Sequence, residues 1–75
     1  MQTYANLGGN SNVVGYELGA GYIIVYFRDG HSYLYTDASA GPDNIAEMHA
    51  LAEAGRGLNA FIRRYVYNRY ESKLT

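Results

Sequence analysis

The fold is decided by residues 22–36, which read YIIVYFRDGHSYLYT. Two runs rich in β-branched and aromatic residues, 22–27 and 31–36, flank a short polar segment, and such runs are typical of strands. The Asp29-Gly30 pair between them is a strong hairpin signal. We therefore predict two antiparallel strands joined by a tight turn.

The length of this turn decides which side chains face the core. A two-residue turn would pair Tyr26 with Tyr33, whereas a three-residue turn, with Gly30 in the left-handed conformation, would pair Val25 with Tyr33. A slip of one residue moves every side chain to the other face of the sheet. We favour the three-residue turn, which places Tyr33 and Tyr35 on the core face with their hydroxyls at its edge.

The chain before the hairpin predicts a third strand and an arm. Residues 13–18 alternate weakly, and only three residues, 19–21, connect them to the next strand, so the three strands form an antiparallel meander. Residues 1–12 are rich in loop formers, and we expect an extended arm that Tyr4 and Leu7 attach to the core or to a neighbouring chain.

The chain after the hairpin predicts two helices. Pro42 suits the first position of a helix that Gly41 caps, and Gly55 suits its left-handed end. A second helix is expected from about residue 58 to 70, with an apolar stripe made of Leu58, Phe61, Ile62, Tyr65 and Val66. We predict an α+β fold of order β-β-β-α-α, with both helices on one face of the sheet and residues 13–75 forming one domain.

Several classes of function have no residues to support them. The chain has no cysteine, and His31 and His49 lie 18 residues apart without metal-ligand spacing. No serine stands in a nucleophile motif. We therefore expect neither an enzyme nor a cofactor. Because no apolar run approaches the roughly 18–20 residues of a membrane span and no secretory leader is recognisable, we expect a cytoplasmic protein.

Charge is distributed unevenly along the chain. Residues 1–54 carry one arginine against six acidic residues, a net charge of −5, whereas residues 55–75 carry five cations against one acidic residue, a net charge of +4. Arginine and tyrosine interleave in the basic segment, and these residue types grip phosphates and stack on bases. The same residues also serve as a solvated helix face or as protein-interface anchors, and Gly55 and Gly57 also serve as a helix end and a turn. The candidate ligand-binding residues are Arg56, Arg63, Arg64, Tyr67, Tyr33, Tyr35 and Asn59.

Two segments together resemble a known family. The first is 23–35, with its Asp-Gly turn and the Tyr33-x-Tyr35 pair, and the second is 57–65, GLNAFIRRY. Both are similar to the KTSC domain, a small module named for the C-terminus of some lysyl-tRNA synthetases, although Leu58 stands where that family usually has an aromatic residue. The resemblance implies a free-standing bacterial or phage protein and, through the synthetase association, RNA binding.

Two functions follow as hypotheses. The first is a non-enzymatic module that binds RNA, single-stranded nucleic acid or a nucleotide. The alternative is a protein-interaction module, such as a phage or mobile-element factor that sequesters or inhibits a host component. In either case we expect a homo-oligomer, because a chain of 75 residues has a small core and the outward side chains of 22–26 are apolar.

Overall fold

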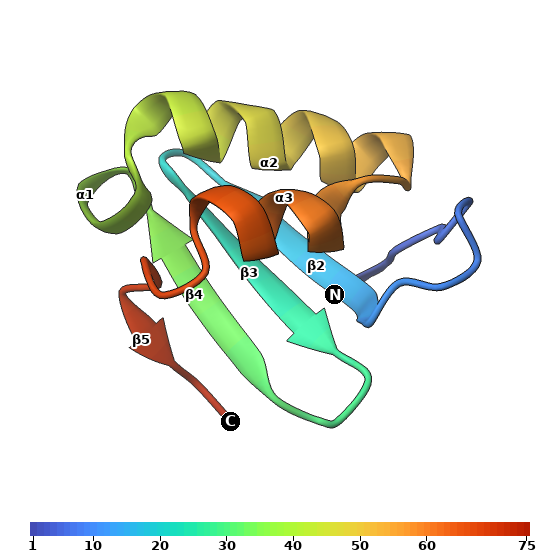
Figure 1. The fold of residues 1–75 in the computed structure, drawn as a ribbon. Helices are drawn as coiled ribbons and strands as arrows, with labels where there is room; N and C mark the ends of the chain where they lie inside the picture. Colours follow the sequence, from blue (N-terminus) through green and yellow to red (C-terminus); the bar gives the residue numbers. More distant parts are fainter.

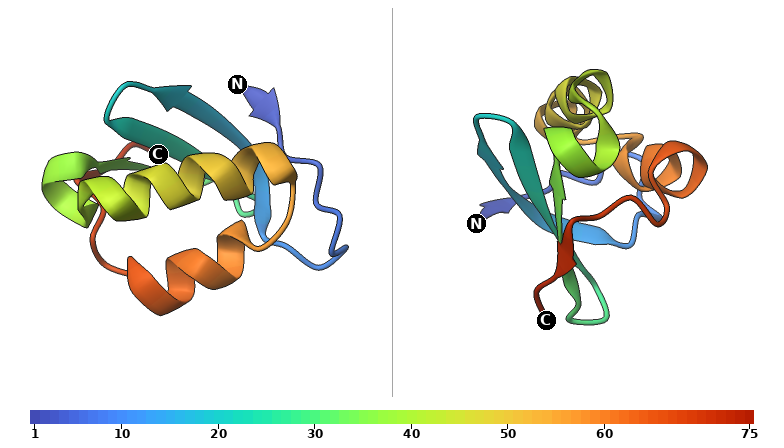
Figure 2. Two further views of the ribbon diagram at one scale, coloured as in Figure 1. Left: turned by 90° about the horizontal axis from the view of Figure 1, so that it is seen from above. Right: turned by 90° about the vertical axis from the view of Figure 1, so that its left-hand side faces the viewer.

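Five antiparallel strands form one sheet in the order β1-β2-β3-β4-β5, and the two longer helices lie side by side over one of its faces (Figures 1 and 2). This computed structural model describes all 75 residues. The strands are β1 (Gln2–Thr3), β2 (Val13–Gly19), β3 (Tyr22–Phe27), β4 (Ser32–Thr36) and β5 (Ser72–Lys73). The helices are α1 (Asp37–Ala40), α2 (Pro42–Ala54) and α3 (Leu58–Tyr65). The predicted α+β meander followed by helices is confirmed.

The hairpin between β3 and β4 has the favoured register. Val25 pairs with Tyr33, and Gly30 has a φ of 92°, as the three-residue turn requires. The N–H of Phe27 donates to the carbonyl of His31 at 2.8 Å and closes the turn. Tyr35 consequently points into the core, where it is 2% exposed.

The first long helix also follows the prediction. Helix α2 begins with Pro42 directly after Gly41, and Gly55 ends it with a φ of 78°. The N–H of Gly55 donates to the carbonyl of Leu51 at 3.0 Å. Because the local capping residues decide both ends, the sequence alone was sufficient to place this helix. Its buried side chains are Ile45, Met48 and Ala52.

The second long helix is shorter than predicted. Helix α3 ends at Tyr65, not at Tyr70, and Tyr65 is exposed although the predicted apolar stripe included it. Val66 is fully buried at the point where the chain leaves the helix. Beyond it, the N–H of Glu71 donates to the carbonyl of Leu34, and β5 pairs with β4. Pairing with the sheet therefore replaces the last helical turn.

The expected N-terminal arm is attached to the domain by the side chain of Tyr4 and by the backbone of Leu7, whose N–H donates to the carbonyl of Gly55 at 2.7 Å. Strand β1 pairs with β2, and Tyr4, immediately after β1, is only 4% exposed. The Tyr4 hydroxyl accepts a hydrogen bond from the N–H of Leu58 at 3.2 Å. The Leu7 side chain remains exposed. The arm thus contributes to the core and holds the start of α3.

Helix α1 was not predicted. It follows β4 directly, and Thr36 caps it: the Thr36 side chain accepts from the Ser39 N–H while the Ser39 hydroxyl accepts from the Thr36 N–H. This capping box is visible in the sequence only as Thr-x-x-Ser, which departs from the usual pattern ending in Glu or Gln.

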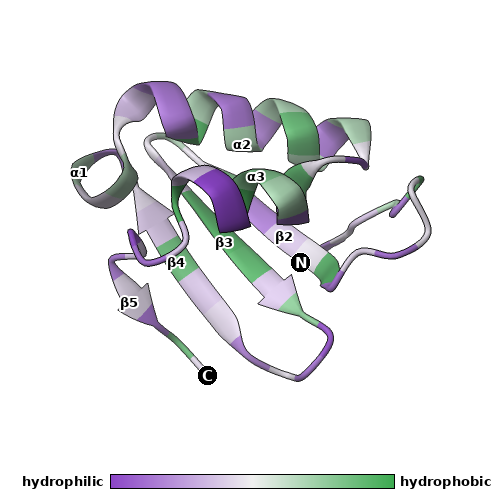
Figure 3. Cartoon of the chain, viewed as in Figure 1, coloured by the Kyte–Doolittle hydropathy of each residue, from purple (hydrophilic) through white to green (hydrophobic).

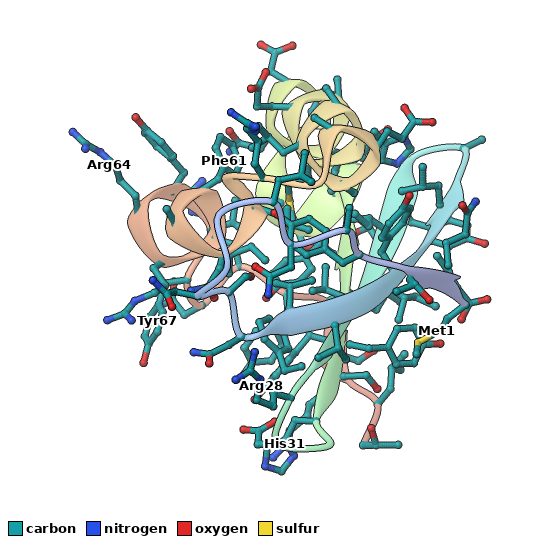
Figure 4. All side chains as sticks on the ribbon, turned by 90° about the vertical axis from the view of Figure 1, so that its right-hand side faces the viewer. Met1, Arg28, His31, Phe61, Arg64 and Tyr67 are labelled. Atoms are coloured by element: carbon teal, nitrogen blue, oxygen red, sulfur yellow. The ribbon has the colours of Figure 1, made fainter.

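The other face of the sheet has no helix over it. The side chains of Tyr22, Ile24 and Tyr26 lie on this face, where the Tyr26 hydroxyl donates a hydrogen bond to the carboxylate of Glu17. Met1 lies at its margin, on the side of the sheet away from the helices (Figure 4). We call this surface the outer face.

None of the three helices has the length and apolar character that crossing a bilayer requires.

Candidate functional site

A groove of about 710 Å³ lies between α3 and the hairpin of β3 and β4. We call it the main groove, and its volume is within the range typical of small-ligand sites, roughly 300–1,000 Å³. Its lining residues are Asn12, Phe27, Arg28, Asp29, Tyr33, Tyr35, Asn59, Ile62, Arg63, Tyr67, Asn68 and Tyr70. Figure 3 shows a strongly hydrophilic stretch near the end of α3 and apolar residues along the middle of β3.

Aromatic rings in mutual contact form the floor of the main groove. The ring of Tyr33 lies 5.7 Å from that of Phe27 and 4.8 Å from that of Tyr70, between centroids. Tyr70 also meets Tyr35 edge-on at 6.5 Å. Burial, followed by the neighbouring Tyr33 and Tyr70, raises the pKa of the Tyr35 hydroxyl well above its ordinary value of 10.

One face of α3 forms a wall of the main groove. Asn59, Ile62 and Arg63 are spaced i, i+3 and i+4, which places them together on a helix surface. Ile62 is buried and anchors this face to the core, while Arg63 is exposed. Tyr67 follows the end of the helix and is 73% exposed, so its ring is free to stack on a ligand.

The tip of the hairpin forms the opposite rim. The Arg28 guanidinium donates to the carbonyl of Ser11 at 3.0 Å, which ties the rim to the N-terminal loop. The Asp29 carboxylate accepts from the N–H of His31 at 3.0 Å and lies 3.9 Å from its ring nitrogen. No other basic side chain in the protein lies within 4.0 Å of a carboxylate. Arg28 and Arg63 therefore face the main groove without a carboxylate partner.

Five of the seven predicted site residues line the main groove, namely Tyr33, Tyr35, Asn59, Arg63 and Tyr67. Arg64 does not, because its guanidinium lies 5.6 Å from the centroid of the Tyr65 ring and projects outward from α3 (Figure 4). Arg56 lines a separate, smaller hollow, which Asn59 also lines.

The candidate ligand-binding residues chosen from the sequence left out seven residues that line this groove, namely Asn12, Phe27, Arg28, Asp29, Ile62, Asn68 and Tyr70. The hairpin register contained a signal for Arg28, since the residue after Phe27 must lie at the tip of the sheet. Asn12 and Asn68 belong to loops, and only the folded structure brings them beside α3.

No protein-family model, curated protein or solved structure matches this chain. The resemblance to the KTSC domain thus stays a prediction. No three histidine or carboxylate side chains gather as a metal site would require. The main groove offers stacking faces, amide groups, two guanidinium groups and one carboxylate, that of Asp29. The two arginines outnumber this carboxylate, and the combination is suited to binding an aromatic anion.

Proposed function

We propose that this protein is a non-enzymatic binding module for RNA, single-stranded nucleic acid or a nucleotide, and that the main groove is its ligand site. One observation carries the proposal: exposed aromatic faces and two arginines without carboxylate partners line the same groove. Nucleic acids present these same two features, flat bases and anionic phosphates. The resemblance to the KTSC domain supports the same function and, with it, a place in the bacterial or phage-infected cytoplasm.

The chemistry of each wall suggests how such a ligand lies. A base stacks on the exposed ring of Tyr67, and the phosphate lies between Arg63 and Arg28, where guanidinium groups bind phosphate oxygens in a bidentate manner. The amides of Asn59 and Asn68 offer both donors and acceptors to the base or the sugar.

Two neighbouring arginines provide a matched test. Arg63→Ala and Arg64→Ala each remove one charge from the same turn of α3, but only Arg63 lines the main groove. We expect Arg63→Ala to weaken the binding of a labelled single-stranded RNA and to reduce the slope of log affinity against log salt by about 0.7. Arg64→Ala should change the affinity and its salt dependence much less.

Fluorescence anisotropy at several salt concentrations between about 50 and 200 mM measures both quantities. Equal losses for the two variants would mean that general charge, and not the main groove, attracts the nucleic acid. If the wild-type protein binds no RNA, single-stranded DNA or nucleotide at low salt, the proposed function is wrong.

The outer face favours a second candidate, a protein-interaction module that also forms a homo-oligomer. Tyr22, Ile24 and Tyr26 lie there without a covering helix, and apolar surface of this kind is typical of protein contacts. Strands β1 and β5 already cover part of both sheet edges, so face-to-face packing is favoured over edge pairing.

The variant Ile24→Glu tests this second candidate. A charge on the outer face should convert an oligomer to a monomer in light scattering and abolish a nuclease-resistant complex with a host protein. Deleting the arm is a poorer test, because Tyr4 is a core residue and its loss destabilises the fold. A wild-type protein that is monomeric over a wide concentration range and retains only nucleic acid from a lysate would contradict this candidate.

A further inference from the structure

A second hollow adjoins the main groove. It has a volume of about 200 Å³ and lies between the N-terminal loop and the start of α3. Arg56 and Gly57 line it, and Asn59 lines both this hollow and the main groove. Arg56 is exposed and, like Arg63, has no carboxylate within 4.0 Å. The second hollow therefore continues the cationic lining beyond the main groove.

A hydrogen-bonded loop connects the two hollows along one side. Ser11 lines the second hollow and the next residue, Asn12, lines the main groove. The N–H of Ser11 donates to the side chain of Asn6 at 3.1 Å, and its carbonyl accepts from Arg28 at 3.0 Å. These two hydrogen bonds fix the loop, so the main groove and the second hollow share one ordered wall.

The separation of Arg56 and Arg63 along the chain suits a strand of several nucleotides better than a single nucleotide. From Leu58, the first residue of α3, to Arg63 the helix rises about 7.5 Å at about 1.5 Å per residue, and Arg56 lies two residues before Leu58, outside the helix. A stacked strand advances about 3.4 Å per nucleotide. The helical segment between the two arginines thus spans about two steps of such a strand.

We propose that the two hollows form a single track for a single-stranded oligonucleotide of about four nucleotides. Arg28 and Arg63 hold the strand in the main groove, Asn59 lies at the junction, and Arg56 binds a phosphate in the second hollow. This proposal rests on the proposed function and specifies its ligand: a strand that runs past Asn59, in place of a free nucleotide that the main groove would hold alone.

A length series tests the track. Uridine monophosphate, diuridylate, tetrauridylate and octauridylate are titrated by two-dimensional NMR, which also detects weak binding, and the matching deoxy series is run in parallel. We expect all ligands to shift amide signals in the main groove, but only the tetranucleotide and longer strands to shift those of Gly57 and Asn10. Affinity should rise steeply up to about four nucleotides and then level off.

Arg56→Ala is the discriminating variant, with Arg64→Ala as the control of equal charge. Arg56→Ala should weaken tetranucleotide binding about fivefold, as expected for one exposed contact with a phosphate, and leave mononucleotide binding unchanged. Arg64→Ala should change neither. Arg56 is an exposed side chain outside the core, so the variant should keep the wild-type melting temperature, which thermal unfolding checks.

The outcomes separate this inference from the proposed function. A rise in affinity from the mononucleotide to the tetranucleotide, in the ribo or the deoxy series, supports the track if Arg56→Ala abolishes that rise. Binding that is independent of length, or a tetranucleotide affinity that Arg56→Ala leaves unchanged, overturns the track and leaves the main groove as a nucleotide site. If no ligand of any length binds, both proposals are wrong.

Discussion

The hydrogen bond between Tyr4 and Leu58 links the N-terminal arm to the helix that carries the candidate site. Removing only the hydroxyl, with Tyr4→Phe, keeps the ring in the core but leaves the N–H of Leu58 without its partner. That N–H lies at the first residue of α3, where no carbonyl of the same helix is available to accept from it. The variant therefore isolates one polar contact between segments 54 residues apart.

The expected cost follows from the burial of both groups. Tyr4 is 4% exposed and Leu58 is fully buried, so water does not replace the lost acceptor. An unsatisfied buried donor costs about 1–3 kcal/mol. A chain of this length has a free energy of unfolding of roughly 4–11 kcal/mol. A loss of about 1.5 kcal/mol lowers the melting temperature of such a small domain by about 6–12 °C.

Urea denaturation and thermal unfolding followed by circular dichroism measure this loss. The urea midpoint should fall while the slope of free energy against urea stays constant, because the surface exposed on unfolding is unchanged. Tyr65→Phe, on an exposed ring of the same helix, is the control and should match the wild type. A Tyr4→Phe protein within about 0.3 kcal/mol of the wild type would refute the argument that this bond holds the start of α3.

Two further predictions concern the backbone and the alkaline limit of stability. Gly55→Ala should destabilise the protein more than Gly30→Ala in urea denaturation: both positions have a positive φ, but an added Cβ at Gly55 would lie 2.6 Å from the Cβ of Ala5, whereas Gly30 has open space. Comparable losses for the two variants would argue against this close approach. The raised pKa of Tyr35 means that the folded protein keeps a proton that the unfolded chain releases above its ordinary pKa of 10. The contribution of Tyr35 to the free energy of unfolding is therefore fully present below pH 10. Above pH 10 the free energy of unfolding falls by up to about 1.4 kcal/mol per pH unit for this proton. Tyr35→Phe should reduce that slope, and an unchanged slope would exclude Tyr35 as its cause.

Local interactions determined the parts of the fold that the sequence predicted correctly. The register of β3 and β4 depends on a turn of three residues, and the ends of α2 depend on Gly41, Pro42 and Gly55, each acting on its immediate neighbours. The choice of residue types for the candidate site also came from the sequence, since five of the seven residues line one groove.

Contacts between distant segments decided the remainder, and no local pattern encodes them. The helical period continues past Tyr65, yet β5 pairs with β4 and ends the helix early, which turns Tyr70 toward Tyr33. Helical periodicity separates Arg63 from its neighbour Arg64, but only the packing of α3 on the sheet shows that Arg63 faces the groove while Arg64 faces solvent. The site thus depends on where the sheet, the arm and α3 meet, which is a property of the tertiary structure.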